Sequence, residues 1–448
     1  MKKFMLICAP VTSRSGYGDH ARDLVTSFIE HDKYDIKIAD VRWGDCPRNA
    51  LDLNNEIHKK INDCIIIPNK PLEKQPDVYV DIRIPNEFQQ VGKVNIGITA
   101  GIETTIVSAA WIDGCNKMDL IIVPSEHSKE GFANAVYDKL QNLPDGQQQK
   151  VGEIKLQKPI EVLFEGTDEE VYKPIDDSSL DLVDNIPEDF CYLFVGQWTK
   201  GGYGEDRKDI SRLIKVFCES FANQKNPPAL LLKTNGATYS ILDNENIKSN
   251  INKVIKKFPK DFKLPKIYLL HGDLSLEEMN KLYNHSKVKA MVSFTHGEGF
   301  GRPLLEATMT GLPVMTTGWS GHIDFLTPDE SLLIGGDLVD VPKSVIWKDI
   351  IVEGSKWFQI NENVAYNGLR HIFNEYDLVK SNAQKLMEKN RINFTLNKMT
   401  QKLDEIVSPL IEKIPQQVSL KLPKLKKTGA PKLPKLKKIN KQEVVEAK

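Results

Sequence analysis

The sequence lacks the patterns by which metal-binding, disulfide-bonded and membrane proteins are usually recognised. Its six cysteines are scattered through 448 residues without a CxxC pair, which favours free thiols in a reducing compartment over a zinc site or a disulfide framework. No apolar run approaches the roughly 18 residues of a membrane span. The opening MKKFMLICAP has only a short apolar stretch and no convincing cleavage site, so we expect a buried first strand rather than a signal peptide. These absences predict a cytoplasmic protein.

The chain also lacks an excess of charge of either sign. Its formal net charge is −1, so composition gives no general argument for a nucleic-acid or acidic partner. Residues 420–441 are an exception, because they hold nine lysines and no acidic residue, which leaves about −10 on the rest of the chain. The motif KLPKLKK occurs there twice, at 421–427 and 432–438, and its prolines break any helix. We expect residues 415–448 to be a disordered tail that either solubilises the protein or is weakly attracted to an anionic membrane or to nucleic acid.

Short apolar runs alternate with amphipathic stretches along the remaining chain, which is typical of βαβ units and parallel sheets. The expected strands are residues 4–9, 34–41, 77–84, 93–99, 118–124 and 160–164 in the first half and 190–197, 229–234, 266–272, 288–294 and 312–317 in the second. An acidic, proline-containing stretch at 166–188 separates the two series and is expected to be an interdomain hinge. Residues 353–414 are expected to be helical and to pack across both domains or onto the second. We therefore predict an α/β chain with domains at 1–172 and 173–414.

The stretch HGEGFGRPLLEATMTGLPV, residues 296–314, carries the clearest chemical signal. It follows an expected strand, and it places Pro303 at the first position of a helix and Gly311 at its end. In a doubly wound domain, ligands bind at such loops beyond the carboxyl ends of the strands. Gly299 and Gly301 let a ligand approach the backbone closely, and the free N–H groups of the helix start favour anionic oxygens. This loop is therefore a candidate anion-binding site.

Two carboxylates flank the glycines of this loop. Glu306, expected in the first helical turn, can face the crevice and accept hydrogen bonds from a diol. Glu298 precedes the glycines and can hold a second hydroxylated group. Such an arrangement suits a ligand that is both phosphorylated and rich in hydroxyls, and a nucleotide sugar is one. The alternative is that both are solvated carboxylates of a loop and a helix start.

The string from Glu298 to Val314 resembles the E-x7-E signature of the retaining glycosyltransferases of family four, together with its EA…G-x-P-V continuation. Further stretches resemble segments of the same family in the expected order, at residues 120–132, 164–174, 193–217 and 270–283. The resemblance covers roughly residues 1–410. It implies the GT-B fold, in which two Rossmann-like doubly wound domains face each other, here followed by a C-terminal helical segment and the basic tail. The first domain would bind the acceptor and the second the donor.

The resemblance also implies roles for individual residues. Glu306 would hold the ribose hydroxyls of the donor, Glu298 would contact the transferred sugar, and Lys208 would neutralise the diphosphate. Backbone groups would line the sugar and diphosphate at Gly299, Phe300 and Gly301. The donor would be a nucleoside diphosphate sugar, and transfer would retain the anomeric configuration without a metal or another cofactor.

Two departures from the family pattern concern charge. Gln197 stands where the family commonly has an arginine, so Lys208 would rely on Arg207 or on Lys233. The acceptor-domain region 95–105 lacks the histidine that many members carry, and Glu103 is the ionisable group there that can substitute. The alternative for the basic pair at 207–208 is an ordinary charged helix entry.

A short GxG motif, Gly16-Tyr-Gly18, follows the first expected strand. It is no dinucleotide fingerprint, because the third glycine and the ribose-binding acid are absent. Its position predicts that it faces the interdomain cleft, where it would contact donor phosphate or acceptor.

The sequence thus predicts a glycosyltransferase that moves a sugar from a nucleoside diphosphate sugar to an acceptor, which is a glycan, a lipid carrier, a protein or a modified base. A non-catalytic GT-B scaffold or binding protein, anchored through its basic tail, is the alternative. The missing arginine and histidine favour the scaffold, whereas Glu298, Glu306 and Lys208 favour the enzyme. An epimerase or a phosphorylase on the same fold is a further enzymatic alternative.

Overall fold

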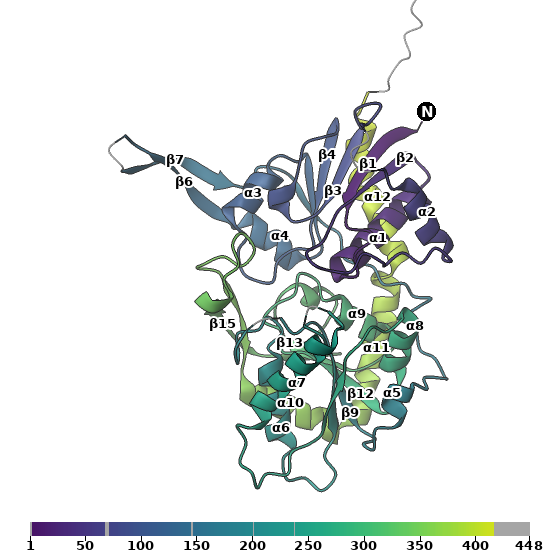
Figure 1. The fold of residues 1–448 in the computed structure, drawn as a ribbon, viewed down its shortest axis with the longest axis vertical. Coiled ribbons are helices and arrows are strands. Elements are labelled where there is room, and N and C mark those ends of the chain that lie inside the picture. The colour runs from purple at the N-terminus through teal and green to yellow at the C-terminus, as the bar shows by residue number, and fades with distance from the viewer. Residues whose placement is uncertain (1, 68–70, 145–146, 200, 237, 416–448) are drawn as a thin grey trace, which may run out of the picture. The chain divides into compact units, whose positions relative to one another are not determined.

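Two six-stranded parallel sheets organise the protein (Figure 1). This computed structural model describes residues 2–67, 71–144, 147–199, 201–236 and 238–415. The lysine-rich tail lies outside the described residues from position 416 onward. The strands of the first sheet, in spatial order, are β2 (Tyr34–Asp40), β1 (Lys3–Ala9), β3 (Val78–Ile82), β4 (Val94–Ile98), β5 (Leu120–Val123) and β8 (Ile160–Val162). The strands of the second are β11 (Ile267–Leu270), β10 (Ala229–Lys233), β9 (Cys191–Val195), β12 (Val288–Val292), β13 (Val314–Thr317) and β14 (Leu332–Ile334).

All eleven strands expected from apolar runs are present, and β14 is an addition at one edge of the second sheet. The expected α/β class is therefore confirmed. Helices cover the sheets in both halves: α1 (Gly16–Glu30), α2 (Glu56–Cys64), α3 (Ala109–Cys115) and α4 (Glu126–Ala133) in the first, and α5 (Asp181–Asp184), α6 (Ile210–Phe221), α7 (Ile241–Ile255), α8 (Leu276–Asn284), α9 (Arg302–Met309), α10 (Glu362–Asn374) and α11 (Tyr376–Asn393) in the second.

Two antiparallel hairpins lie outside the parallel sheets. One is formed by β6 (Val136–Asn142) and β7 (Gln148–Lys155), which extend away from the first sheet in Figure 1. The other is formed by β15 (Gly336–Asp340) and β16 (Lys356–Ile360). The expectation that residues 353–414 are helical is wrong at its start, because β16 occupies 356–360. Trp357, Phe358 and Ile360 are buried there, and burial in a hairpin overrides the weak helical pattern.

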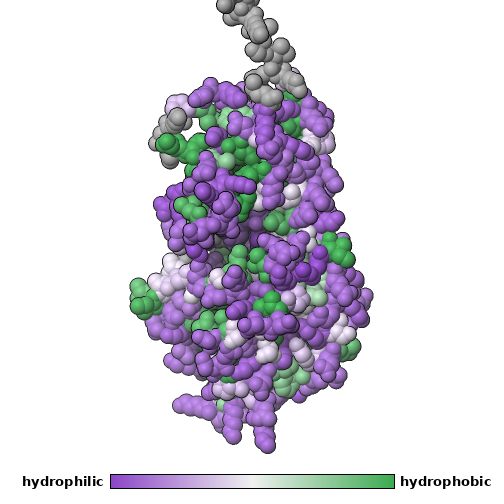
Figure 2. Space-filling model, turned by 90° about the vertical axis from the view of Figure 1, so that its right-hand side faces the viewer, coloured by the Kyte–Doolittle hydropathy of each residue, from purple (hydrophilic) through white to green (hydrophobic). Residues whose placement is uncertain are grey.

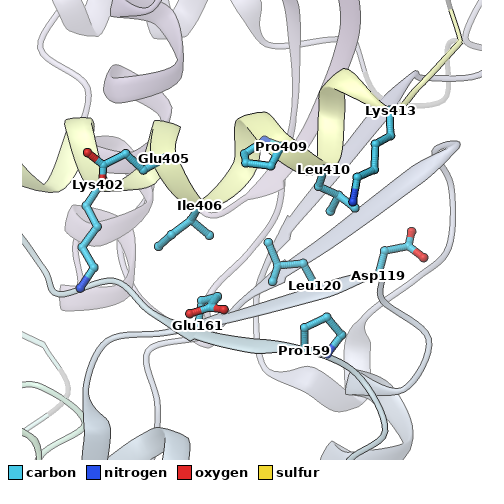
Figure 3. Close-up of a pocket in the computed structure, with 10 residues that line it drawn as sticks. All are labelled: Asp119, Leu120, Pro159, Glu161, Lys402, Glu405, Ile406, Pro409, Leu410 and Lys413. Carbon is cyan, nitrogen blue, oxygen red and sulfur yellow. The ribbon is translucent and has the colours of Figure 1, made fainter.

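The last helix, α12 (Leu396–Glu412), belongs to the core of the first sheet although it ends the described chain. Met399, Leu403, Val407 and Ile411 recur every four residues and are all buried against β1, β3 and α1, as expected for one apolar helix face. Beside this apolar face, Pro409 and Leu410 of α12 line a surface groove of about 420 Å³ that β5 and β8 complete (Figure 3). The chain therefore returns to the domain in which it began.

The two passages of the chain between the sheets lie side by side. Thr167 N–H donates to the Phe394 carbonyl, and Leu396 N–H donates to the Thr167 carbonyl. Gly166 permits this pairing, because a β-carbon there would lie 2.6 Å from Leu396 Cα. The connection between the domains is thus a paired ribbon rather than a single strand.

The second sheet is covered by apolar side chains on both faces. One face packs against α6, α7 and α10, and the other against α8, α9 and α11. Its strands are accordingly almost continuous apolar runs, as parallel sheets require.

The molecular surface shown in Figure 2 is mainly hydrophilic, with apolar side chains in small groups.

Replacing Leu403 by Ala should destabilise the first domain, although residue 403 is far along the chain. The side chain is fully buried, and such a truncation costs about 2–5 kcal/mol of unfolding free energy. Hydrogen exchange followed by mass spectrometry should show faster exchange in β1 and β3. Ile392→Ala is the control, because Ile392 is 64% exposed. Unchanged exchange in β1 and β3 of the Leu403 variant would contradict the assignment of α12 to this core.

Candidate functional site

A cavity of about 230 Å³ lies beyond the carboxyl ends of β9 and β12. The second sheet supplies Gly196 and Gln197 after β9 and Ser293 after β12, and the first domain supplies Gly16. Five residues predicted for the site line this cavity together: Gly16, Arg207, Lys208, Glu298 and Gly301. The parallel topology explains their meeting, since loops from several strands converge at this edge of a doubly wound sheet.

Lys208 and Glu298 form an ion pair in the cavity wall, and each side chain is only 12% exposed. Burial lowers the pKa of the Lys208 ammonium to about 8, although Glu298 beside it favours the charged form. Burial alone would raise the pKa of the Glu298 carboxyl, but Lys208 and Arg207 hold it below its usual value. Folding has already removed most water from the Lys208 ammonium. Binding of a second anion to it would therefore cost little further desolvation.

Arg207 pairs with Glu103 from the loop after β4. This ion pair joins the two domains, and its arginine lines the cavity beside Lys208. Gln197 also lines the cavity, and its side-chain amide donates to the Gly236 carbonyl. The site therefore has two cations, and each is paired with one carboxylate.

The glycine-rich loop is pressed against the first domain. A β-carbon on Gly299 would lie 2.1 Å from the Ala100 carbonyl oxygen, and Ser125 Oγ donates to the Gly299 carbonyl at 2.6 Å. Gly301 has φ +99° and caps α9, a conformation that favours glycine. Gly299 and Phe300 do not line the cavity, because Gly299 contacts backbone and Phe300 packs on Phe325. The loop thus fixes the domain contact as well as the cavity wall.

Glu306 lies beside the cavity without lining it. α9 begins at Arg302, so Pro303 is its second residue and Glu306 lies in the second turn, not in the first as expected. One carboxylate oxygen accepts from Arg302 Nε at 3.2 Å and the other from the Tyr283 hydroxyl at 3.2 Å. Burial raises the pKa of Glu306 to about 7, against the opposing effect of Arg302.

Lys233 and Gly18 lie elsewhere. Lys233 Nζ donates to the Gly272 carbonyl at 2.7 Å and lies outside the cavity lining. Gly18 is buried inside α1, where a β-carbon would lie 2.1 Å from the Ser13 carbonyl oxygen. Close packing of α1 on the preceding loop therefore accounts for this glycine, whereas Gly16 has open space around it.

Residues 200–342 match the family model described as glycosyl transferases group 1. The chain contains a glycosyl transferases group 1 domain. Lys208, Glu298 and Glu306 all lie within this range. Compared with curated protein sequences, the chain has no significant match.

Solved structures of low sequence identity share the fold. Sucrose-phosphate synthase from Thermosynechococcus elongatus aligns with a TM-score of 0.62 at 14% identity, over 92% of this chain and 100% of that one. HepE from Anabaena, solved in complex with UDP and glucose, aligns with a TM-score of 0.58 at 11% identity, over 91% and 100%. A glycosyltransferase from Rickettsia africae aligns with a TM-score of 0.58 at 13% identity, over 92% and 99%. The fold is GT-B, as the sequence predicted.

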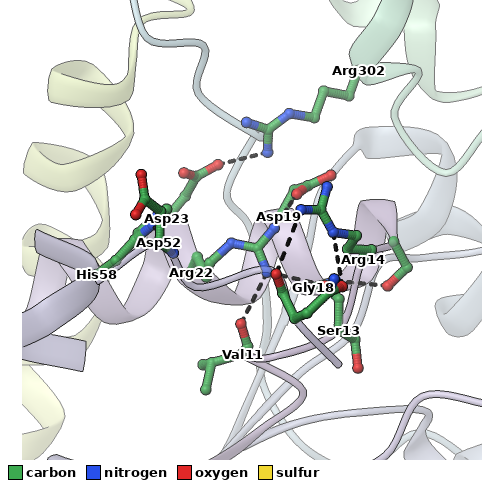
Figure 4. Close-up of polar contacts among 12 residues, drawn as sticks. Val11, Ser13, Arg14, Gly18, Asp19, Arg22, Asp23, Asp52, His58 and Arg302 are labelled. Atoms are coloured by element: carbon green, nitrogen blue, oxygen red, sulfur yellow. Dashed lines mark hydrogen bonds and ion pairs between the residues drawn. The ribbon is translucent and has the colours of Figure 1, made fainter. Parts of the chain in front are cut away.

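The group 1 domain also contains residues beside the site to which the sequence assigned no role. Ser320, at φ +81°, accepts from the Glu298 N–H at 2.9 Å. Arg302 reaches from α9 to Asp23 on α1, with 2.6 Å between Nη1 and Oδ2 (Figure 4). The charge of Arg302 inside the glycine-rich string was a usable signal. Nothing local in the sequence indicates Asp23, which lies 279 positions earlier.

The described residues contain neither a metal-binding cluster nor a membrane-spanning helix. No group of three or more His, Cys, Asp or Glu side chains among them has a metal-binding arrangement. No helix in the same part of the chain is both long and apolar enough to cross a membrane.

Gly299→Ala should separate the two domains, because its β-carbon would meet the Ala100 backbone at 2.1 Å. Small-angle X-ray scattering should give a larger radius of gyration than for the wild type. Gly335→Ala is the matched control, since no atom lies within 4 Å of its β-carbon position. A scattering curve of Gly299→Ala that superimposes on the wild type would refute the close contact.

Glu165→Gln should stabilise the protein at high pH and much less at low pH. Burial raises the pKa of Glu165, in the ribbon between the domains, to about 8. A raised pKa stabilises the fold at low pH, and this contribution is lost as pH rises through the folded-state value. The neutral amide does not have to ionise, so its thermal midpoint should exceed that of the wild type by a few degrees at pH 9 and by much less at pH 5.

The neighbouring Glu170 provides the control, because it is 82% exposed. Glu170→Gln should have the wild-type midpoint at both pH values. An equal difference between Glu165→Gln and wild type at pH 5 and pH 9 would show that ionisation of Glu165 costs no stability.

Proposed function

We propose that the protein is a glycosyltransferase that moves a sugar from a nucleoside diphosphate sugar to an acceptor, with retention of configuration and without a metal. The observation that carries this proposal is the buried Lys208–Glu298 pair in the wall of a glycine-lined cavity within the group 1 domain. The HepE neighbour, whose structure contains UDP and glucose, supports the same class of ligand.

The charge arrangement suits a diphosphate leaving group. As the bond between the sugar and the diphosphate breaks, positive charge develops on the sugar ring and negative charge on the departing oxygen. Lys208 and Arg207 are fixed cations that would stabilise this oxygen, so a metal ion is not required. Because they are held by protein packing, little reorganisation would accompany the reaction.

The carboxylates now paired with these cations would take a second role. When the diphosphate binds Lys208 and Arg207, their partners Glu298 and Glu103 become available to hydroxyl groups. Glu298, on the donor domain, would accept hydrogen bonds from the transferred sugar. Glu103, on the first domain, would face the acceptor. The positions of the two partners thus match the division between donor and acceptor domains.

Retention requires that the acceptor attack from the side on which the diphosphate leaves. The acceptor hydroxyl would then lie beside the diphosphate, and an oxygen of the diphosphate would receive its proton. Glu306, on the helix whose first residues line the cavity, would hold the ribose hydroxyls. A glycan, a lipid carrier, a protein or a modified base would fit this scheme as acceptor, and the lysine-rich tail would supply any attraction to an anionic surface.

The alternative is a non-catalytic GT-B scaffold. The observation in its favour is that Gln197, which is uncharged, lines the cavity where the resemblance led us to expect an arginine. Nucleotide binding and donor turnover distinguish the two proposals.

Lys208→Ala should weaken the binding of UDP, GDP or ADP, whichever the wild type binds, in titration calorimetry with EDTA present. The loss should be about tenfold or more, because a hydrogen bond to a charged group contributes about 1.5–3 kcal/mol. Release of nucleotide from the corresponding nucleotide sugar should fall as well. Lys215→Ala is the control, since Lys215 pairs with Glu219 and Glu362 outside the cavity. If the folded wild type binds none of the three nucleotides, the scaffold proposal replaces this one.

A further inference from the structure

One guanidinium holds a carboxylate from each domain. Arg302 Nη1 donates to Asp23 of α1 at 2.6 Å, and Arg302 Nε donates to Glu306 of its own helix at 3.2 Å (Figure 4). The three side chains are between 11% and 20% exposed. Because guanidinium is planar, contact with Asp23 at one nitrogen fixes the direction in which Nε points.

Acidic groups dominate the surroundings of Glu306. The titratable and charged groups that interact with it or with its arginine are Arg302 on α9, Tyr283 on α8, Glu165 and Tyr172 in the connection after β8, and Asp19, His20 and Asp23 on α1. Arg302 opposes the effect of these acids on Glu306. On the first domain, Arg22 pairs with Asp19 and donates to the carbonyls of Val11 and Ser13, so it is committed to its own loop (Figure 4).

We propose that Arg302 is a positioning residue that couples docking of the first domain, through Asp23, to nucleotide binding at Glu306. The inference rests on the proposed function, because it takes Glu306 as the group that receives the ribose hydroxyls. When Asp23 is in place, Nη1 turns towards it, so Arg302 contacts Glu306 through Nε alone, at one of the two carboxylate oxygens. When the domains separate, Arg302 loses Asp23 and closes on Glu306 with both nitrogens, which competes with the ribose.

Loss of Arg302 and loss of Asp23 therefore have different consequences. In Arg302→Gln, Glu306 loses its cation, and the pKa of this carboxyl rises further above its wild-type value of about 7. Nucleotide affinity should then be low at pH 7 and recover as pH rises to 9. In Asp23→Asn, Glu306 is the remaining carboxylate partner of this pair for Arg302, so the pKa of Glu306 falls. A ribose would then have to displace the arginine from Glu306. Affinity should then be low at every pH.

The experiment is calorimetric titration with UDP, GDP and ADP between pH 6 and pH 9. Wild-type affinity should rise with pH around 7. For Arg302→Gln the midpoint should move up by about one pH unit, which is about a fivefold loss at pH 7. For Asp23→Asn the midpoint should move down, with about tenfold weaker binding throughout. Arg302→Lys keeps the positive charge but cannot contact Asp23 and Glu306 through two nitrogens of one planar group. It should therefore keep the wild-type pH midpoint and bind nucleotide more weakly.

A third interdomain ion pair provides the matched control. Arg14 and Asp273 pair at the exposed rim, and they are 40% and 48% exposed. Asp273→Asn removes an interdomain carboxylate without touching Arg302, so it should bind nucleotide as the wild type does. The thermal midpoint of each variant, measured at pH 7, identifies any that is unfolded, and either Asp23→Asn or Arg302→Lys alone suffices to test the coupling.

The outcomes separate this inference from the proposed function. If the wild type binds nucleotide while Arg302→Gln and Asp23→Asn show its affinity and pH profile, the coupling is refuted and the glycosyltransferase proposal stands. If Asp273→Asn weakens binding as much as Asp23→Asn does, the effect is general adhesion between domains, and the coupling is again refuted. If the folded wild type binds no nucleotide, both proposals fall. Opposite shifts of the pH midpoint in the two variants, with Asp273→Asn unchanged, establish the coupling.

Discussion

Partly buried charges between the two domains are paired across the domain boundary. Arg207 pairs with Glu103, and Arg302 pairs with Asp23, so in both cases a cation of the second domain meets a carboxylate of the first. Removing one partner from a buried pair leaves an uncompensated charge, which is costly. Each pair is therefore complete only while the domains are docked. The Lys208–Glu298 pair differs, because both residues belong to the second domain. Separation of the domains would break the first two pairs and leave this one intact.

The glycines of the site make that docking possible. Gly297 and Gly299 face the carbonyl oxygens of Glu103 and Ala100 at distances where no side chain fits, and Ser125 binds the Gly299 carbonyl. Backbone from the first domain therefore lies directly on the loop that forms the cavity wall. The same loop places Glu298 beside Lys208. The contact between the domains and the Lys208–Glu298 ion pair thus depend on one short segment, and the close contact explains why Gly297 and Gly299 lack side chains.

The parts of this structure that local patterns determine were predictable. Buried parallel strands are continuous apolar runs, so all eleven expected strands are present. Lys208 and Glu298 lie 90 positions apart and still meet, because both follow strands that end at the same edge of one sheet. Contacts without a local pattern were not predictable. Asp23 is one polar residue on an amphipathic helix, and the return of α12 to the first sheet is decided by packing at Met399 and Leu403. The prediction of helix at residues 356–360 was wrong because pairing with β15, not the periodicity of the sequence, determines this strand.

The return of α12 also determines how the domains can move. Two chain segments cross between them, and they pair through Thr167, Phe394 and Leu396. Both chain connections between the domains therefore lie at this ribbon, so bending of one domain against the other would occur there. Glu165 lies in the ribbon itself, and its carboxyl interacts with Arg302 and Asp23. Bending there changes the distance between α1 and α9 directly, whereas Lys208 and Glu298 move together as parts of one domain. The geometry thus separates the Lys208–Glu298 pair, which would persist through opening, from the bridge of Arg302 to Asp23 and Glu306, which is complete only when the domains are closed.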